Sequence, residues 1–296
     1  MMEIVEATIL KGVGGFYYIR WQGREIECKA GGRLRLRRDF RPAVGDLARV
    51  ELRGEDEGLI TEILPRRSFL LRPPIANIDQ LIIVASEADP TTDPYLIDQV
   101  SVVALRQGIQ PVLALNKADL RPSARFEEIY RQAGFPTIPV SAQTGQGLEE
   151  LRLLLRGKSS AFTGNSGVGK SSLLNRLEPG FGLETGSISR ISRGRHTTRR
   201  VELFPLQDGG FAADTPGFSS FDISRIDRIP KEELEQYFPE FEPYIGQCRF
   251  SGCAHCKEPG CAVDQACAEG LIAPSRLESY RRLYEEMAKW KEWQTN

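Results

Sequence analysis

The first 65 residues alternate between hydrophobic and polar positions in short runs that glycines interrupt. Clear alternation occurs over residues 24–28, 48–52 and 59–63, and none of these runs has helical spacing. Because a period of two places every second side chain on one face of a strand, the pattern predicts five or six short strands. Short strands separated by glycine turns are typical of a small barrel, so we expect an OB-type β-barrel over residues 1–68.

After Pro73 and Pro74 the pattern changes to hydrophobic strands that alternate with amphipathic helices. Asp93 followed by Pro94 predicts a helix start, because aspartate caps a first turn and proline fits its first position. Strands are predicted at residues 81–86, 112–115, 137–140, 160–163 and 211–213, and further helices at 123–134, 148–155 and 172–177. This alternation predicts an α/β fold with a parallel, doubly wound sheet over residues 69–222.

The last part of the chain, residues 223–296, has a different character. A short acidic helix follows Pro230, then a cysteine-rich stretch, then a final amphipathic helix. Ser275 and Glu278 have the spacing of a capping box, which predicts that the final helix begins there. With the two regions above, this part gives three predicted domains.

The composition is that of a soluble globular protein. Of 296 residues, 41% are hydrophobic and 27% are charged, which excludes wholesale disorder. No apolar run approaches the roughly 18 residues of a membrane helix, and the N-terminus lacks a signal-peptide pattern. We therefore expect a cytoplasmic protein without membrane association. In a reducing compartment its six cysteines are expected to be thiols or metal ligands rather than disulfides.

The formal net charge of −1 conceals two basic segments. Residues 24–41 carry seven basic and three acidic side chains, and residues 186–200 carry five arginines and no acid. Residues 222–296 offset them with 10 basic and 14 acidic side chains. On a strand, the alternation within residues 33–38 would form an exposed basic row, which suits RNA binding; a solvated charged surface is the alternative. The candidate RNA contacts are Arg33, Arg35, Arg37, Arg193 and Arg195.

A glycine-rich phosphate loop is the strongest motif in the chain. Residues 164–171 have the pattern G-x-x-x-x-G-K-S between a predicted strand and a predicted helix. The glycines let backbone N–H groups surround phosphate oxygens, Lys170 can reach the β- and γ-phosphates, and the Ser171 hydroxyl can bind Mg²⁺. The predicted phosphate contacts are Gly164, Asn165, Ser166, Gly167, Val168, Gly169, Lys170, Ser171 and Ser172.

A second motif, at residues 116–119, predicts that the base is guanine. The Asp119 carboxylate can accept hydrogen bonds from guanine N1 and N2, whereas adenine offers no matching donor pair. Asn116 can bond the base edge, and the Lys117 stem can lie over the ring. The predicted base contacts are Asn116, Lys117, Ala118, Asp119, Ser141 and Ala142.

A third motif, Asp-x-x-Gly at Asp214 and Gly217, follows a short apolar strand. Asp214 would hold Mg²⁺ through water, and the Gly217 N–H would sense the γ-phosphate. Many GTPases carry a water-orienting glutamine at the next position, where this chain has Phe218. Phenylalanine cannot orient water, so we expect either a very low intrinsic rate or another group in its place.

His196 is the candidate for that group, because a neutral imidazole can position water. The alternative is a surface histidine that contacts RNA. We expect Lys170 and Thr198 to complete the catalytic set with His196, and the Mg²⁺ ligands to be Ser171, Asp214 and Thr198. Spacing does not distinguish Thr198 from Thr197 as the switch ligand.

The motifs stand in an unusual order, because base recognition precedes the phosphate loop and the switches. A closed set of strands that is cut and rejoined elsewhere gives this order, which predicts a circularly permuted GTPase. A family resemblance rests on this motif order, on residues 72–80 and 194–198, and on the cysteine cluster. Nearly the whole chain resembles the bacterial ribosome small-subunit-dependent GTPase A family. The resemblance implies an OB barrel, a permuted P-loop GTPase core and a C-terminal zinc domain. It also implies a water-positioning role for His196.

Five of the six cysteines lie between Cys248 and Cys267, and with one histidine they predict a zinc site. The family pattern maps onto Cys248, Cys253, His255 and Cys261. Cys256 is an extra thiol, so a site in which it replaces His255 remains open. Four ligands leave no open coordination position, which predicts a structural zinc ion.

From the family resemblance we expect a GTPase that binds the small ribosomal subunit and its rRNA during late maturation, with hydrolysis stimulated by the subunit. We expect it to be monomeric off the ribosome. The switch at Asp214 runs directly into the C-terminal part, so loss of the γ-phosphate is expected to reorient the zinc domain and the barrel. One alternative is an RNA-binding checkpoint with little intrinsic catalysis, which Phe218 favours. Another is an accessory GTPase of an RNA-modification system.

Overall fold

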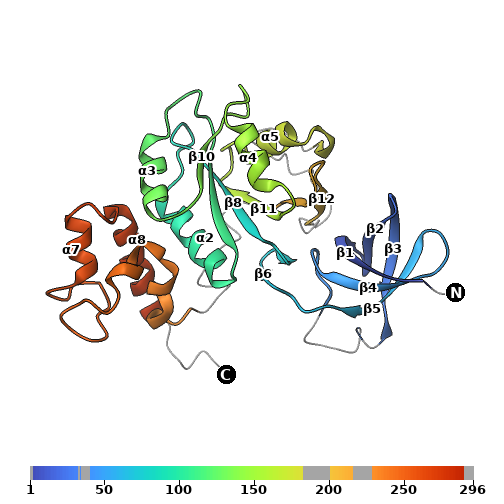
Figure 1. Cartoon of the computed structure of the whole chain (residues 1–296), viewed down its shortest axis with the longest axis horizontal. Helices are drawn as coiled ribbons and strands as arrows, with labels where there is room; N and C mark the ends of the chain where they lie inside the picture. The colour runs from blue at the N-terminus through green and yellow to red at the C-terminus, as the bar shows by residue number, and fades with distance from the viewer. Residues whose placement is uncertain (1–2, 33, 35–40, 183–200, 216–228, 290–296) are drawn as a thin grey trace.

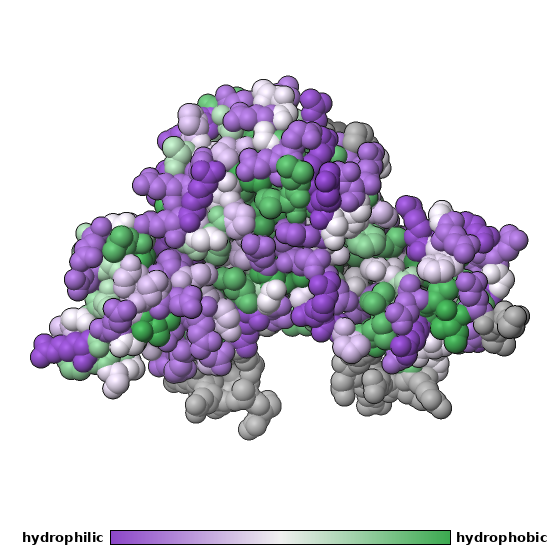
Figure 2. Space-filling view, viewed as in Figure 1, coloured by the Kyte–Doolittle hydropathy of each residue, from purple (hydrophilic) through white to green (hydrophobic). Residues whose placement is uncertain are grey.

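The computed structural model of the chain describes residues 3–32, 34, 41–182, 201–215 and 229–289. The described residues form an arch, with an α/β core in the middle, a barrel at one end and C-terminal helices at the other (Figure 1). Figure 2 shows the same face in space-filling form, with hydrophobic residues in small patches among hydrophilic ones. None of the helices in the described part of the chain combines the length and apolar character needed to cross a membrane.

Five strands close the N-terminal barrel in the order β1-β2-β3-β5-β4. They are β1 (Ile4–Val13), β2 (Phe16–Trp21), β3 (Arg24–Ala30), β4 (Leu47–Leu52) and β5 (Glu57–Ile63). Alternate side chains face a core that belongs to the barrel alone; in β3 these are Ile26, Cys28 and Ala30. The predicted OB-type barrel is therefore confirmed.

The basic row over residues 33–38 requires a strand, and the structure has none at Leu34, the position within this segment that it describes. Leu34 is helical, its N–H donates to the carbonyl of Gly31 at 3.0 Å, and its side chain is buried in the barrel core. One turn of helix suffices to direct a leucine inward, so alternation over so few residues does not distinguish the two structures. Arg33, Arg35 and Arg37 lie outside the described residues.

A small hairpin connects the barrel to the core. It consists of β6 (Phe69–Leu71) and β7 (Pro74–Ala76), and the barrel backbone at Gly45 lies directly against it. The Asn77 side chain donates to the Gly45 carbonyl at 2.9 Å. Arg66 pairs with Asp46, whose side chain is fully buried, at 2.7 Å. A close backbone approach and a buried ion pair thus fix this junction.

A six-stranded sheet forms the core in the order β10-β9-β8-β11-β13-β12. Its strands are β8 (Gln80–Ala85), β9 (Gln110–Leu115), β10 (Thr137–Pro139), β11 (Ser159–Gly164), β12 (Leu203–Pro205) and β13 (Phe211–Asp214). The predicted parallel α/β sheet is confirmed except at its edge, where β12 runs antiparallel to β13. The turn of residues 206–210 between these strands is too short for a parallel crossover. Beside β12, Glu202 forms an antiparallel bridge with Lys11 of the barrel.

Helices cover both faces of this sheet. They are α2 (Pro94–Arg106), α3 (Ala124–Gln132), α4 (Leu148–Leu155) and α5 (Lys170–Leu177), and a short 3-10 turn, η1 (Pro179–Phe181), follows α5. Because strand side chains alternate, Ile83 packs in the cluster with α2 and α3, and Ile82 packs in the cluster with α4 and α5. The Asp93 carboxylate accepts from the Tyr95 N–H at 3.0 Å, as the predicted helix cap requires.

The C-terminal part packs on the α2 side of the core. Its elements are η3 (Lys231–Tyr237), η4 (Pro239–Tyr244), α7 (Ala262–Ala268) and α8 (Pro274–Ala288). Phe238 and Tyr280 belong to the same hydrophobic cluster as the α2 side chains. Arg276 of α8 is fully buried, and it donates to Asp98 of α2 at 2.7 Å and to Glu240 at 2.6 Å. The C-terminal part and the core therefore share one interior.

The predicted start of the final helix is wrong by two residues. Helix α8 has Ala273 as its N-cap and Pro274 in its first turn, and no side chain caps it. Ser275 therefore lies inside the helix. Proline suits a first helical position because it lacks the N–H that would be left unpaired there, and this preference outweighs the capping-box spacing.

Candidate active site

The nucleotide motifs meet at the carboxyl edge of the sheet. The phosphate loop follows β11, the motif at residues 116–119 follows β9, Ser141 follows β10, and Asp214 is the last residue of β13. Parallel strands bring their carboxyl ends to one edge, which is where ligands bind in open α/β sheets. The structure thus brings together motifs that are far apart in sequence, with 98 positions separating Asn116 from Asp214.

The phosphate loop turns tightly into α5. Gly169 has φ +90°, and a Cβ there would lie 2.5 Å from the Asn116 amide nitrogen, so the position requires glycine. Val168 is completely buried under the loop. Helix α5 begins at Lys170 and directs its first backbone N–H groups to this edge, where they suit an anion. Ser171 is half-buried and Ser172 is exposed in its first turn, and Ser166 is exposed in the loop.

Asn116 makes hydrogen bonds within the protein that the sequence did not indicate. Its side-chain nitrogen donates to the Val168 carbonyl at 2.8 Å, and its side-chain oxygen accepts from the Ala142 N–H at 3.1 Å. The residue is 3% exposed. Asn116 therefore joins the base motif to the phosphate loop and to the loop after β10, in addition to its predicted role at the base edge.

The other predicted base contacts line the same edge. Lys117 has φ +65°, and its Nζ donates to the Asp89 carbonyl at 2.6 Å. The Ala118 N–H donates to Val140 at 3.1 Å, and Asp119, the next residue, is exposed. The buried Ser141 hydroxyl accepts from the Thr144 N–H at 3.0 Å, which fixes the loop after β10. The Asp119 carboxylate is therefore accessible to a ligand, beside a lysine that the Asp89 carbonyl anchors.

Lys170 and Asp214 form an ion pair at the centre of the edge. Lys170 Nζ also donates to the Thr215 carbonyl at 2.9 Å. The two charges neutralise each other within the protein. A Mg²⁺-nucleotide would offer each a new partner of opposite sign, phosphate oxygens for Lys170 and the hydrated ion for Asp214.

Several predicted residues lie outside the part of the chain that the structure describes. They are His196, Thr197, Thr198, Arg193, Arg195, Gly217 and Phe218. The neighbouring Thr215 is described and buried, and its hydroxyl donates to the Phe162 carbonyl at 2.8 Å. The strand end that precedes the Asp-x-x-Gly switch is therefore tied to the strand that precedes the phosphate loop.

A second cluster of functional side chains lies in the C-terminal part. The ligand atoms of Cys248, Cys253, His255 and Cys261 all lie within 4.8 Å of one another. Backbone N–H groups donate to the sulfurs. The Ala262 nitrogen lies 3.3 Å from Cys248 Sγ, and the His255 backbone nitrogen lies 3.4 Å from Cys253 Sγ. Three thiols and one imidazole converging in this way fit a tetrahedral zinc site.

The His255 ring is oriented by a contact that the sequence analysis missed. Nδ1 lies 3.3 Å from Cys261 Sγ and 3.6 Å from Cys248 Sγ, and Nε2 lies 2.9 Å from a Glu235 carboxylate oxygen. This places Nδ1 as the ligand atom and Nε2–H as the donor to Glu235. Cys256 Sγ faces the Ala254 carbonyl at 3.4 Å instead, and it is not one of the four converging ligands.

Without a metal ion, burial keeps two thiols of the cluster protonated. Burial raises the pKa of the Cys253 thiol to about 12, and it also raises the pKa of Cys261. A metal ion supplies the positive charge that would turn these thiols into thiolates. Burial opposes the ionisation of Glu258, but N–H donors from Lys257 and nearby residues outweigh it and lower its pKa to about 2. The ionised Glu258 holds the loop between the ligands.

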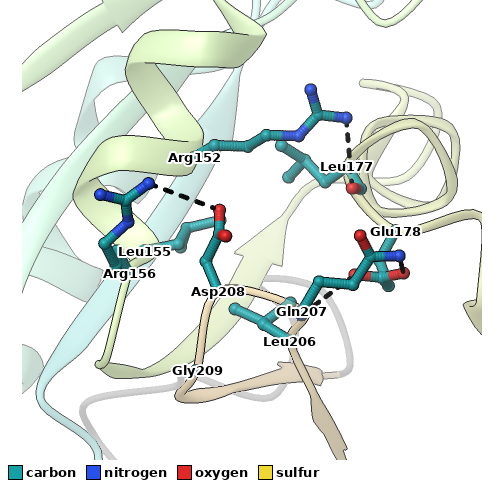
Figure 3. A pocket seen from close by; sticks show the side chains of 9 residues that line it. All are labelled: Arg152, Leu155, Arg156, Leu177, Glu178, Leu206, Gln207, Asp208 and Gly209. Carbon is teal, nitrogen blue, oxygen red and sulfur yellow. Dashed lines mark hydrogen bonds and ion pairs between the residues drawn. The ribbon is translucent and has the colours of Figure 1, made fainter.

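A hollow of about 440 Å³ lies away from both clusters (Figure 3). It is lined by the ends of α4 and α5 and by the turn between β12 and β13, at the amino ends of the strands. Its polar groups pair with one another, as Arg152 donates to the Leu177 carbonyl at 3.3 Å and Gln207 donates to Glu178 at 3.0 Å. None of the described residues that line it belongs to the predicted site.

Two family models match the chain. The model described as RsgA GTPase matches residues 63–224, and the model described as RsgA N-terminal domain matches residues 6–60. The chain belongs to the RsgA GTPase family. Two curated relatives are named small ribosomal subunit biogenesis GTPase RsgA. The one from Caldanaerobacter subterraneus subsp. tengcongensis is 45% identical over 97% of both chains. The one from Moorella thermoacetica is 47% identical over 93% of this chain and 95% of its own.

Two solved structures share the fold of this chain. YjeQ from Thermotoga maritima is 33% identical and superposes with a TM-score of 0.82, covering 98% of this chain and 100% of its own. YloQ, described as a circularly permuted GTPase, is 32% identical with a TM-score of 0.79, covering 98% of this chain and 96% of its own. The predicted permutation and the family resemblance are therefore confirmed.

Proposed function

We propose that this RsgA family member binds GTP with Mg²⁺ at the carboxyl edge of its sheet and hydrolyses it on the small ribosomal subunit, late in maturation of the subunit. The observation that carries the proposal is the meeting of Lys170, Asp119 and Asp214 at one edge. The curated relatives named as small ribosomal subunit biogenesis GTPases support the partner and the process.

The chemistry of this site is positioning and charge neutralisation. In phosphoryl transfer the protein holds the reacting oxygens in line and stabilises charge on the transferred group. Lys170 exchanges its bond to Asp214 for the β- and γ-phosphate oxygens, and Asp119 selects guanine. Ser171, Thr198 and Asp214 would hold Mg²⁺, which supplies further positive charge at these oxygens. The Gly217 N–H responds to the γ-phosphate.

His196 takes the place of the missing glutamine, because Phe218 cannot orient water. We expect the imidazole to position the attacking water when the protein is bound to the small subunit. His196→Ala should remove the subunit-stimulated rate and leave GTP affinity intact. Full stimulation in this variant would exclude the catalytic role of His196.

Zinc and RNA complete the proposed function. Cys248, Cys253, His255 and Cys261 would hold one structural zinc ion. The basic segments around Arg33 and Arg195 would contact rRNA, with Arg35, Arg37 and Arg193 beside them. The protein acts as a cytoplasmic monomer off the ribosome.

The deciding experiment measures GTP turnover by the full chain alone and with small subunits, large subunits or tRNA. We expect stimulation by small subunits alone. Equal stimulation by large subunits would remove the proposed partner, and stimulation by tRNA would favour an accessory GTPase of RNA modification.

Phe218 favours a second candidate, a nucleotide-gated checkpoint whose hydrolysis only resets it. This function requires that the protein bind small subunits more tightly with a non-hydrolysable GTP analogue than with GDP. Tight GTP-dependent binding without stimulated turnover would establish the checkpoint, whereas equal binding with both nucleotides would eliminate it.

A further inference from the structure

The order of the strands places one unassigned loop inside the nucleotide site. Strand β8 lies between β9, which precedes the base motif, and β11, which precedes the phosphate loop. The loop of residues 86–92 follows β8 at the same carboxyl edge. It therefore lies between the two ends of the nucleotide-binding edge, and it contacts both.

Thr92 makes the contact with the phosphate loop. Its side chain is 1% exposed, and its hydroxyl oxygen lies 3.0 Å from the Ser86 N–H and 2.8 Å from the side-chain oxygen of Asn165. The hydroxyl accepts from Ser86, so its single proton is directed at Asn165. Thr92 also returns its own N–H to the Ser86 carbonyl at 2.9 Å, which closes the loop on itself.

Pro90 adds a steric contact to this hydrogen bond. A Cβ on Gly167 would lie 3.1 Å from Pro90 Cγ, so the proline ring covers the phosphate loop at its middle glycine. Gly167 has φ +81°, a conformation that side chains disfavour. The 86–92 loop thus meets the phosphate loop at its second and fourth positions.

The same loop anchors the base motif. The Asp89 carbonyl accepts from Lys117 Nζ at 2.6 Å. The Glu87 carboxylate accepts from the Phe126 N–H at 2.8 Å, and the Glu87 carbonyl accepts from Arg121 at 3.3 Å. Each end of the nucleotide site therefore depends on a contact with this one loop.

We propose that Thr92 is a positioning residue for GTP binding, which acts by fixing Asn165 and with it the phosphate loop. The 86–92 loop couples this phosphate anchor to the lysine of the base motif. The inference rests on the proposed GTP site and assigns a new residue to it. Thr92 itself need not touch the nucleotide.

Thr92→Val tests the role, because valine keeps the shape of threonine and removes only the hydroxyl. It leaves the Ser86 N–H and the Asn165 oxygen without this partner in a buried place. We expect GDP and GTP to bind about tenfold more weakly, as for the loss of a buried hydrogen bond. Because the phosphate loop holds GTP and GDP alike, the change should weaken binding without affecting the chemical step. KM should therefore rise with kcat nearly unchanged.

Thr91→Val is the matched control, because Thr91 is the exposed neighbour of Thr92 and its hydroxyl bonds within its own loop. It should bind GDP and GTP like the wild type. Thr92→Ser keeps the hydroxyl and should restore most of the affinity. If the serine variant binds as weakly as the valine variant, the hydroxyl is not the cause and the inference fails.

A double-mutant cycle separates positioning from a general structural effect. If Thr92 acts through Asn165, Asn165→Ala and Thr92→Val together should weaken binding no more than the stronger single change. Additive losses would overturn the inference. Thermal unfolding without nucleotide checks the fold of each variant, and Thr92→Cys, with its weak donor, replaces the valine variant if that one does not fold. The cysteine variant must then bind more weakly than the serine variant.

The wild-type protein distinguishes this inference from the proposed function. If the wild type does not bind GTP, the proposed function fails. If the wild type binds GTP and Thr92→Val binds it equally well, the proposed function stands and only the role of Thr92 fails.

Discussion

At the scale of single residues, His255 contributes both of its ring nitrogens to the C-terminal cluster. Nδ1 faces the thiols of Cys248 and Cys261, and Nε2 lies 2.9 Å from the Glu235 carboxylate. A carboxylate on the far nitrogen of a histidine ligand fixes its tautomer and ring orientation and raises its basicity. Glu235 would therefore support metal binding without being a ligand.

We expect Glu235→Gln to weaken zinc binding by about 10- to 100-fold, the usual effect of losing such a partner. Competition with a chromophoric chelator measures this affinity directly in the purified protein. Glu232→Gln on the same helix is the control, since the Glu232 side chain is 70% exposed and pairs only loosely with Lys231 at 3.9 Å. Equal zinc affinity in the two variants would show that Glu235 does not orient the ring.

At the scale of elements, α8 is held to the core by a buried charge cluster. The Arg276 guanidinium is enclosed by the rings of Phe238 and Phe135, whose centroids lie 4.5 and 5.3 Å away. It neutralises Asp98 and Glu240, and the side chains of Arg276 and Asp98 are fully buried. Removing one partner of a buried ion pair leaves an uncompensated charge in the interior, which is strongly destabilising.

Arg276→Met should lower the free energy of unfolding by about 3–5 kcal/mol, because it leaves Asp98 and Glu240 buried without their cation. Urea unfolding followed by fluorescence measures the change. Arg282→Met is the matched control on the same helix, where the side chain is 58% exposed, its ion pair is worth less than about 1 kcal/mol, and its contact with the Tyr95 ring at 3.7 Å adds about 0.5–1 kcal/mol. Similar losses in both variants would mean that the buried cluster contributes no more to the free energy of unfolding than the exposed arginine does.

The strands and motif loops could be predicted because their signals are local. A continuous apolar run marks β8, Asp93 followed by Pro94 marks α2, and the glycines mark the phosphate loop. Local signals also misled, since Pro274 overrode the spacing at Ser275 and a leucine buried by one helical turn resembled a strand residue. The error in each case came from two local preferences that compete over a few residues.

The supporting contacts of the sites could not be predicted. Thr92 and Asn165 are 73 positions apart, and Glu235 and His255 are 20 apart. Nothing in the sequence near either residue indicates its partner, because the contact depends on strand order and helix packing. The sequence therefore predicted candidate ligand contacts, and only the fold identified the groups that hold those residues in place.

At the scale of the whole molecule, the two junctions of the core differ in how much buried interior they share with it. The C-terminal part shares a hydrophobic interior and a buried arginine with α2. The barrel has a core of its own, but Leu10 and Val44 also belong to the hydrophobic cluster of the α/β core, beside the Gly45 contact, the Asp46–Arg66 pair and the Lys11–Glu202 bridge. Glu202 comes two residues after the basic segment of residues 186–200, which contains the candidate switch ligands Thr197 and Thr198. We therefore expect nucleotide-dependent movement at the barrel junction, whereas the buried Arg276 pairs argue against the sequence-based expectation that the C-terminal part also reorients.

Gly45→Ala should disrupt the barrel junction. Gly45 has φ +88°, and an added Cβ would lie 2.0 Å from the Ala76 carbonyl oxygen. The backbone conformation alone costs about 1–2 kcal/mol for a side chain, and the clash adds about 1–3 kcal/mol that separating the barrel would relieve. Small-angle scattering should show a larger radius of gyration, and limited proteolysis should cleave faster near the hairpin.

Gly54→Ala is the control for this change. Gly54 has nearly the same φ, +86°, but nothing lies within 4 Å of its added Cβ. It should lose stability from the backbone alone and keep the native radius of gyration. If both variants keep that radius, the close approach at Ala76 does not hold the barrel in place.

The bridge between Lys11 and Glu202 also bears on solubility. Strand β12 is the edge of the core sheet, and an open edge can recruit strands from other copies and start aggregation. Three features limit that risk: β12 has three residues, Pro205 removes one N–H donor, and β1 of the barrel pairs beside it. The barrel thus shields the edge of the core sheet, in addition to being a candidate RNA-binding module. A change that releases the barrel should therefore make the protein prone to self-association.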